Sequence, residues 1–272
     1  MNGAKISARV LLLGGGNMGA AMARGWLDIL AEPGNILVID PQAGVPLQPL
    51  LAKGVRHAAT VPDEVFDIVV LAVKPQIMAA ALPALKPALR PDTLVISVAA
   101  GKTIDFITER LGSLPIVRTM PNTPALIGRG ITGAFANSLV DARLRDTASA
   151  LLAASGAVEW LDSEDEIDAV VGVSGSGPAY VFLMAEVMAA AGEKLGLKPE
   201  LAMRLAQHTI AGAGELMLQA SDEPAQLRRN VTSPKGTTQA ALEVLMADNG
   251  LAPLLEKAIA AAVQRSRELS QD

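Results

Sequence analysis

The stretch from Val10 to Gly19 constrains the fold of this chain more than any other segment. Four apolar residues, Val-Leu-Leu-Leu, run directly into a G-x-G-x-x-G pattern formed by Gly14, Gly16 and Gly19. In such a pattern the first glycine permits a tight turn, the second lets a pyrophosphate approach the backbone, and the third lets the next helix lie close to the strand. A helical segment from Ala20 to Leu30 completes the strand, turn and helix.

An acidic residue follows at the distance typical of a dinucleotide site. A second apolar strand, Ile36–Ile39, ends in Asp40. A carboxylate about 20 residues beyond the glycines accepts a hydrogen bond from a ribose hydroxyl in such sites. The alternative is a glycine-rich turn without a ligand. Because the glycines and the acid occur together on the first two strands, we predict dinucleotide binding.

Short apolar strands continue to alternate with helical segments through the first half of the chain. The expected strands are at residues 67–73, 93–98, 116–119, 130–136 and 157–161, the last two enclosing a helix at 141–155. This alternation predicts an α/β domain of the Rossmann type, with a doubly wound, mostly parallel sheet that binds ligands at the carboxyl ends of its strands. The loops expected to share that edge are residues 14–19, 40–42, 73–76, 99–101 and 120–123.

The second half of the chain has only helical periodicity. The expected helices are at residues 164–173, 179–195, 199–219, 223–230, 237–248 and 251–269. We therefore predict a dinucleotide-binding domain at residues 1–162 and an all-helical domain at residues 163–272, with the boundary near Asp162.

One helix of this second domain, expected around Ala179–Ala191, is apolar over most of its circumference. It is shorter than the ~20 residues needed to cross a bilayer and contains Glu186, so we expect a buried helix. Because a small helical domain cannot bury this much apolar surface alone, we expect it to associate with another copy of the chain.

Two non-helical interruptions stand out in the helical half, Ser174–Pro178 and Thr232–Thr238. Both place hydroxyls and flexible backbone N–H groups directly before a helix, an arrangement that receives anions. Ordinary helix caps with a nearby proline have the same composition. Two such segments in one small domain favour anion binding.

Composition excludes several other functions. The formal net charge is −5, so no basic face for nucleic acid is indicated. The chain has no cysteine, which excludes disulfides, thiol catalysis and a cysteine metal site, and no other pattern indicates a metal. The N-terminal apolar run is only Val10–Leu13, too short for the core of a signal peptide, so we expect a cytoplasmic protein without membrane association.

The motifs, taken in order, strongly resemble those of pyrroline-5-carboxylate reductases. They are Gly-Gly-Asn-Met-Gly at 15–19, Ala-Val-Lys-Pro at 72–75, Ser-Val-Ala-Ala-Gly at 97–101, Arg-Thr-Met-Pro-Asn-Thr-Pro at 118–124, Val-Ser-Gly-Ser-Gly-Pro-Ala-Tyr at 173–180 and Thr-Ser-Pro-Lys-Gly-Thr-Thr at 232–238. The resemblance implies an enzyme that makes L-proline by reducing 1-pyrroline-5-carboxylate with NADPH or NADH. It also implies a homodimer or a ring of dimers, built through the helical domain.

The resemblance also implies which residues bind the ligands. Those for the dinucleotide are Gly16, Asn17, Met18, Gly19, Val73, Lys74, Pro75, Ala99, Ala100 and Gly101, to which the fingerprint itself adds Gly14 and Asp40. Those for the substrate carboxylate are Ser233, Lys235, Gly236, Thr237 and Thr238, with the backbone N–H groups of the last three as donors. For catalysis we expect the Thr238 hydroxyl to contact the ring nitrogen, while Ser176 and Asn122 hold the nicotinamide amide or the substrate.

The sequence departs from the family pattern at two of these positions. Lys235 occupies what is usually a second glycine, which would stiffen the loop or bring a positive charge toward the substrate carboxylate. Asp40 stands where members that prefer NADPH often have a neutral residue, and no arginine follows within residues 40–45 to offset its charge. NADH is therefore as well supported as NADPH.

Two other functions fit a chain of this build: an imine or 3-hydroxyacid reductase, and a dinucleotide sensor without catalysis. A hydroxyacid dehydrogenase of this type is expected to carry a catalytic lysine on the first long helix of its second domain. Here Lys194 lies near the C-terminal end of that helix, far along the chain from Ser174–Pro178. A sensor would not need the second anion-binding loop.

Overall fold

The computed structural model describes residues 5–271 and contains two compact units. Unit 1 comprises the chain up to Gly175 together with the residues from Val263 on, and unit 2 comprises Ser176–Ala262. This division differs from the predicted boundary near Asp162. The chain after Asp162 still packs on the sheet, where Val170 covers Gly133, and the last turns of the final helix return to unit 1, where the Ser266 hydroxyl donates to Asp168.

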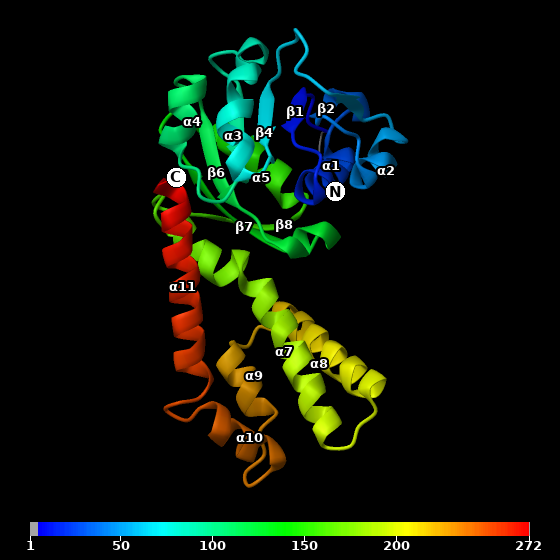
Figure 1. Cartoon of the computed structure of the whole chain (residues 1–272), viewed down its shortest axis with the longest axis vertical. Helices are drawn as coiled ribbons and strands as arrows, with labels where there is room; N and C mark the ends of the chain where they lie inside the picture. Colours follow the sequence, from blue (N-terminus) through cyan, green and yellow to red (C-terminus); the bar gives the residue numbers. More distant parts are fainter. Residues whose placement is uncertain (1–4, 272) are drawn as a thin grey trace. The chain divides into compact units, whose positions relative to one another are not determined.

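Unit 1 is built on an eight-stranded sheet in the order β3-β2-β1-β4-β5-β6-β7-β8 (Figure 1). All neighbouring strands are parallel except β6 and β7, which are antiparallel. The predicted doubly wound, mostly parallel sheet is therefore confirmed. The strands are β1 (Val10–Leu13), β2 (Ile36–Ile39), β3 (Arg56–Ala58), β4 (Ile68–Leu71), β5 (Leu94–Ser97), β6 (Ile116–Met120), β7 (Gly130–Ala136) and β8 (Gly156–Trp160).

Alternate residues of the buried strands enter two separate cores, one on each face of the sheet. On one face Val10 and Leu12 pack with Trp26 of α1 and with Leu151 of α5. Leu11, the residue between them, belongs to the core on the other face of the sheet. The helices of unit 1 are α1 (Asn17–Ile29), α2 (Gln48–Leu51), α3 (Pro75–Ala81), α4 (Ile104–Leu111), α5 (Ala142–Ala153) and α6 (Glu166–Val170), with 3-10 turns at Pro33–Asn35, Val45–Leu47, Leu82–Ala88 and Thr123–Ile127.

Two local features of unit 1 were not expected. Residues Arg56–Ala58 form the edge strand β3, which pairs with β2 although it has no apolar run of its own. The helix expected at 164–173 is instead α6 followed by a π-helical turn at Val171–Gly175.

Unit 2 is entirely helical. Its first two helices lie side by side, and its small core consists of Ala189, Ala202 and Ala206 with Met203 against them. The helices are α7 (Gly177–Lys194), α8 (Pro199–Gln219), α9 (Pro224–Asn230), α10 (Thr237–Leu245) and the first part of α11 (Leu251–Gln271).

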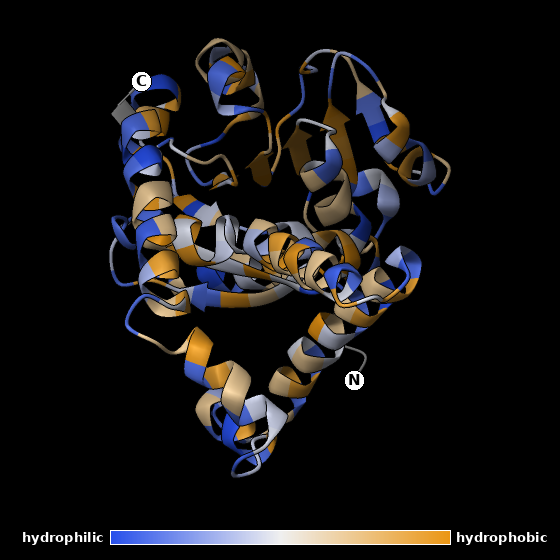
Figure 2. Ribbon diagram, turned by 60° about the horizontal axis from the view of Figure 1, so that its bottom comes forward, coloured by the Kyte–Doolittle hydropathy of each residue, from blue (hydrophilic) through white to orange (hydrophobic). Residues whose placement is uncertain are grey.

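The expectation that the α7 segment is buried is wrong for a single chain. Only Ala189 of α7 is buried, and Phe182 is 62% exposed. Apolar residues recur along the helices of this unit (Figure 2). With α6 and the π turn, the helical run Glu166–Lys194 is also longer than expected and passes a length and hydropathy test for a membrane span, although a single helix of this kind is weak evidence. An apolar surface left uncovered in one copy of a chain is typical of an interface.

Candidate functional site

The glycine turn after β1 has the geometry that the motif predicts. Gly14 adopts φ +103°, and its N–H donates to the Ile39 carbonyl oxygen at 2.8 Å. A Cβ atom on Gly14 would lie 2.7 Å from the Ala72 carbonyl oxygen, and one on Gly19 would lie 2.2 Å from the Gly14 carbonyl oxygen. Both positions therefore require glycine, the first because of its backbone conformation and both because of close packing.

The start of α1 is open and uncapped. Gly16 is the N-cap residue, no side chain caps the helix, and its first turn contains no acidic residue. A Cβ atom built on Gly16 would have no heavy atom within 4 Å. Free N–H groups, the positive end of the helix dipole and open space above Gly16 are the features that a pyrophosphate requires, so the turn fits a dinucleotide.

Asp40 lies at the carboxyl end of β2, next to the glycine turn. Its carboxylate accepts hydrogen bonds from the backbone N–H groups of Gly15, at 2.8 Å, and Gln42, at 3.1 Å. The ring Nε2 of His57, on β3, lies 2.9 Å from the Asp40 carbonyl oxygen. The Asp40 carboxylate is thus held in place as an anionic acceptor, with lone pairs left for a ribose hydroxyl.

Two further loops leave the carboxyl ends of β4 and β5. Val73 and Lys74 lead into Pro75, the first residue of α3, and Lys74 is exposed. Ala99, Ala100 and Gly101 follow β5, with Gly101 at φ +70°. The structure thus brings these predicted cofactor residues to the same edge of the sheet as Gly14, because β1, β4 and β5 are adjacent parallel strands.

The loop after β6 is linked to the segment that precedes α7. The Asn122 amide nitrogen donates to the Ser174 hydroxyl at 3.2 Å, and its oxygen accepts from the Ile131 N–H at 3.0 Å. Met120 packs against Gly175, where a Cβ atom would lie 2.5 Å from its Cε. Ser176, which the resemblance predicts to hold the nicotinamide amide or the substrate, is the N-cap residue of α7 and the first residue of unit 2.

The predicted substrate loop lies before α10 in unit 2. Lys235 adopts φ +59°, the one left-handed non-glycine residue in the described part of the chain, and its N–H donates to the Gln239 side chain at 2.8 Å. The Gly236 N–H donates to the Ser233 carbonyl oxygen at 3.0 Å, so this donor is already used within the loop. No side chain caps α10, which leaves the first N–H groups of the helix, those of Thr237 and Thr238, for an anion.

Sequence reasoning passed over two residues that shape these loops. Ser174 bonds to Asn122; it lies in the segment Ser174–Pro178 that the sequence singles out, but no role was predicted for it. Gln239 is the third residue of α10, and its side chain accepts from the Lys235 N–H, one residue before the N-cap Gly236. Among residues 5–271, no group of three or more side chains could hold a metal ion.

Two family profiles match the chain. The family described as pyrroline-5-carboxylate reductase dimerisation matches residues 164–269, and the family described as NADP oxidoreductase, coenzyme F420-dependent, matches residues 9–101.

Similar proteins extend over nearly the whole chain. A pyrroline-5-carboxylate reductase of Pseudomonas aeruginosa is 45% identical over 97% of both chains. A crystal structure of a pyrroline-5-carboxylate reductase from Coxiella burnetii has 39% identity and a TM-score of 0.90, covering 97% of this chain and 99% of its own. The Plasmodium falciparum pyrroline carboxylate reductase, solved with NADP bound, has 29% identity and a TM-score of 0.83, covering 98% of this chain and 99% of its own.

Proposed function

The chain belongs to the pyrroline-5-carboxylate reductase family, and from this we propose how its residues divide the work of the reaction. It is an NAD(P)H-dependent oxidoreductase that reduces 1-pyrroline-5-carboxylate to L-proline, the last step of proline biosynthesis. The observation that carries our assignment of residues is the uncapped start of α1 beside the open Gly16.

The cofactor is held by the edge of unit 1. The N–H groups of Asn17, Met18 and Gly19 receive the pyrophosphate, because they are the first donors of α1 and lack intrahelical acceptors. The other loops on the same edge, Val73–Pro75 and Ala99–Gly101, contact the nicotinamide half of the cofactor. A reduced nicotinamide bound there supplies the hydride.

Asp40 makes NADH at least as good a cofactor as NADPH. Its carboxylate is fixed by the Gly15 and Gln42 N–H groups and can accept a hydrogen bond from the ribose 2′-hydroxyl of NADH. A 2′-phosphate would place additional negative charge beside the same carboxylate. Residues 40–45 contain no arginine to compensate this repulsion.

The substrate carboxylate is received by the loop Ser233–Thr238. The free N–H groups of Thr237 and Thr238 are donors at an uncapped helix start, and the charge of Lys235 adds attraction for an anion. Because the Gly236 N–H already bonds to Ser233, we assign it to loop shape rather than to direct binding.

Thr238 then contacts the ring nitrogen. Hydride adds to the carbon of the C=N bond, and an iminium nitrogen loses its positive charge as the C–N double bond becomes single. If the imine binds already protonated, no side chain has to donate a proton during this step. The protein must align the ring and offer the nitrogen a hydrogen-bond partner, which the Thr238 hydroxyl provides. Asn122 and Ser176 fix the nicotinamide amide or the ring.

Replacing Thr238 tests this assignment. We expect Thr238→Ala to lower kcat about 10- to 100-fold while the Kd for NADH stays within twofold, because the lost hydroxyl contacts only the substrate. Thr238→Ser keeps the hydroxyl and should retain most of the rate. Steady-state kinetics with saturating 1-pyrroline-5-carboxylate and a fluorescence titration of NADH measure both quantities. An unchanged kcat in Thr238→Ala would remove Thr238 from the mechanism.

The protein acts as a cytoplasmic homo-oligomer built through the helical unit. Phe182, Val187 and Leu205 are each half exposed or more in one chain, although a soluble monomer rarely leaves such a continuous apolar surface uncovered. A second copy that covers α7 and α8 also explains why the helical run Glu166–Lys194 is so apolar without a membrane. We expect a dimer or a ring of dimers.

A further inference from the structure

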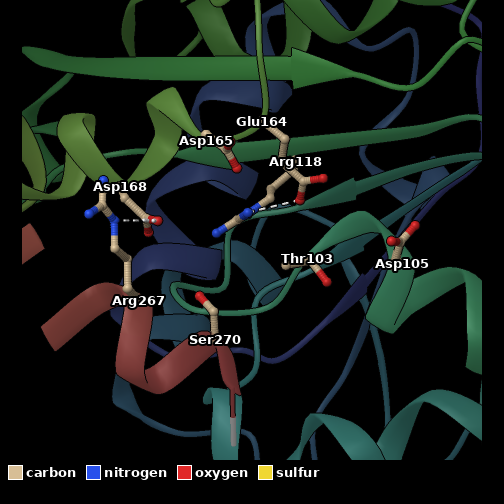
Figure 3. A pocket seen from close by; sticks show the side chains of 8 residues that line it. All are labelled: Thr103, Asp105, Arg118, Glu164, Asp165, Asp168, Arg267 and Ser270. Atoms are coloured by element: carbon tan, nitrogen blue, oxygen red, sulfur yellow. Dashed lines mark hydrogen bonds and ion pairs between the residues drawn. The ribbon is translucent and has the colours of Figure 1, made fainter. Parts of the chain in front are cut away.

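Unit 1 contains a cavity whose lining residues differ from those of the cofactor loops. We call it the Arg118 pocket; it has a volume of about 480 Å³. Figure 3 shows its lining side chains, which come from the start of α4, from β6, from the α6 region and from the end of α11. They are Thr103, Asp105, Arg118, Glu164, Asp165, Asp168, Arg267 and Ser270, and all belong to unit 1.

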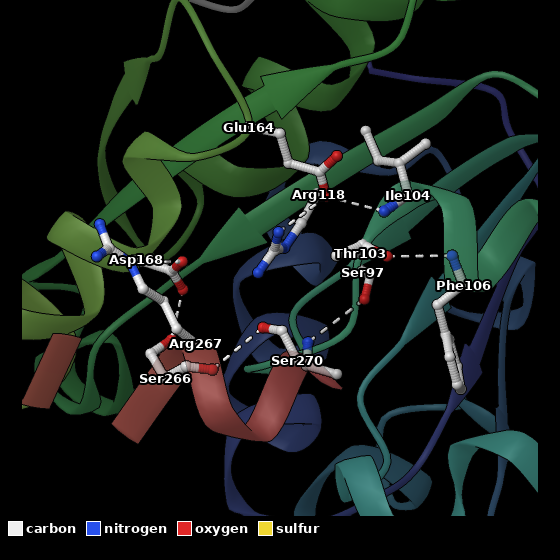
Figure 4. Close-up of polar contacts among 11 residues, drawn as sticks. Ser97, Thr103, Ile104, Phe106, Arg118, Glu164, Asp168, Ser266, Arg267 and Ser270 are labelled. Atoms are coloured by element: carbon white, nitrogen blue, oxygen red, sulfur yellow. Dashed lines mark hydrogen bonds and ion pairs between the residues drawn. The ribbon is translucent and has the colours of Figure 1, made fainter. Parts of the chain in front are cut away.

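Arg118 is the most unusual of these residues because its guanidinium is buried and only partly bonded. Its side chain is 4% exposed, and its Nη1 donates to Glu164 Oε1 at 2.8 Å. The same Glu164 oxygen accepts from the Ile104 N–H at 2.8 Å (Figure 4). Within the described residues, Nε and Nη2 of Arg118 have no hydrogen-bond partner. Glu164 thus bonds one side of the guanidinium through Nη1, while the other edge has two unused donors.

The unused edge has the geometry of a carboxylate receptor. Nε–H and one Nη2–H point the same way from the planar guanidinium and match the two oxygens of a carboxylate. Buried donors of a charged group are costly to leave without acceptors. In Figure 3 the end of Arg118 points into the space between Asp165, Asp168 and Ser270.

The rest of the lining disfavours a plain anion. Four carboxylates and two guanidinium groups line the pocket. Glu164 pairs with Arg118, and Asp168 accepts from the Ser266 hydroxyl at 2.6 Å and lies 3.9 Å from Arg267 Nε. Asp105 and Asp165 have no ion pair among the described residues. The rim therefore carries excess negative charge, which repels an anion but attracts a ligand with a cationic group.

We propose that the Arg118 pocket binds a small zwitterion of the amino-acid class, separately from the cofactor and substrate sites. The ligand's carboxylate bonds to Nε and Nη2 of Arg118, and its ammonium group faces the acidic rim formed by Asp105, Asp165 and Asp168. A carboxylate alone would satisfy Arg118 but meet the rim's repulsion, and a cation alone would leave the guanidinium edge unbonded.

The proposal is tested by titrating the protein with zwitterions and, for comparison, with small ions that carry only one kind of charge. The zwitterionic probes are glycine, β-alanine and 4-aminobutyrate, which differ in the distance between their charges. The comparison probes are acetate, methylammonium, inorganic phosphate and Ca²⁺. Ligand-observed NMR in the presence of saturating NADH measures each Kd. We expect one zwitterion to bind at least tenfold more tightly than acetate, methylammonium and phosphate. Equal or tighter binding of phosphate or Ca²⁺ would overturn the proposal, as would no binding at all.

Variants locate the bound zwitterion. Arg118→Lys keeps a positive charge beside Glu164 but removes the two-donor edge, and Asp165→Asn changes a single exposed carboxylate of the rim. Each should weaken binding of the best zwitterion at least tenfold. Asp146→Asn, an exposed acid on α5 outside the pocket, is the matched control and should leave Kd unchanged.

A further comparison separates this site from the substrate loop. In Thr238→Ala we expect unchanged zwitterion binding, because that residue lies in unit 2. Binding that survives Asp165→Asn and Arg118→Lys but is lost in Thr238→Ala would place the ligand on the substrate loop and overturn the proposal. Reductase activity, measured in parallel, reports the proposed function independently of this outcome.

Discussion

Lys235 holds a backbone conformation that side chains rarely adopt. Its φ of +59° lies in the left-handed region, which costs a residue with a Cβ roughly 1–2 kcal/mol relative to glycine. This conformation is easiest for glycine, the residue that the resemblance leads us to expect at this position. Its N–H is nevertheless used, by Gln239, so the turn is stabilised by the helix that follows.

Substitutions at Lys235 separate strain from charge. We expect Lys235→Gly to raise the free energy of unfolding by about 0.5–1 kcal/mol, since the relief of strain exceeds the added entropy of the unfolded chain. Lys235→Asn tolerates the left-handed conformation and removes the charge. Both variants should raise the KM for 1-pyrroline-5-carboxylate about two- to tenfold if the lysine attracts the carboxylate. Urea unfolding and steady-state kinetics measure these effects, and an unchanged KM in both variants would exclude that attraction.

Asp40 is the residue at which we expect cofactor choice to be decided. Asp40→Asn keeps the size of the side chain and can keep an acceptor toward Gly15, but it removes the charge that opposes a 2′-phosphate. We expect the ratio of kcat/KM for NADPH to that for NADH to rise at least tenfold, equivalent to about 1.4 kcal/mol. The kinetics of the unmodified protein with both cofactors provide the reference. If the ratio does not change, the charge of Asp40 does not determine the preference.

At the scale of the first helix, two glycines three residues apart have opposite roles. Gly16 faces open space, whereas a Cβ on Gly19 would strike the Gly14 carbonyl oxygen at 2.2 Å. We expect Gly16→Ala to change stability by less than about 1 kcal/mol and to weaken NADH binding at least tenfold, because the methyl group stands where the pyrophosphate approaches.

Gly19→Ala should instead destabilise unit 1 by about 1–3 kcal/mol, because α1 must move away from β1. Chemical unfolding followed by tryptophan fluorescence reports stability, since Trp26 of α1 is fully buried. NADH titration of both variants completes the comparison. Undiminished NADH binding in Gly16→Ala would contradict the assignment of the pyrophosphate to this turn.

Helices and strands with a clear local sequence pattern were predicted correctly. The helix expected at 199–219 has those bounds, because Pro199 is well placed as a first helical residue and apolar periodicity continues to Gln219. Strand β3 was missed because Arg56, His57 and Ala58 lack any strand pattern and are extended only through pairing with β2. The π turn at Val171–Gly175 likewise has no signal in composition.

At the scale of the whole molecule, the helical unit leaves large apolar side chains exposed in one chain. We expect Phe182→Glu, on α7, to dissociate the oligomer, because it places a charge on an apolar face that is 62% exposed at this residue in one chain. Leu139→Glu, at an exposed apolar residue of unit 1, is the control and should leave the assembly intact. Size-exclusion chromatography with light scattering measures the mass. An unchanged mass for Phe182→Glu would place the interface elsewhere.

The amino-acid sequence alone was sufficient to predict the glycine turn after β1, most of the strands and helices, and the family, because these depend on short patterns of apolar residues, glycines and hydroxyls. Only the tertiary structure decided the bond between Asn122 and Ser174, the return of the final helix to unit 1 and the half-bonded Arg118. Each joins residues more than 40 positions apart or depends on what surrounds a buried group. Such contacts arise only when the strands and helices pack together, and no local pattern encodes them.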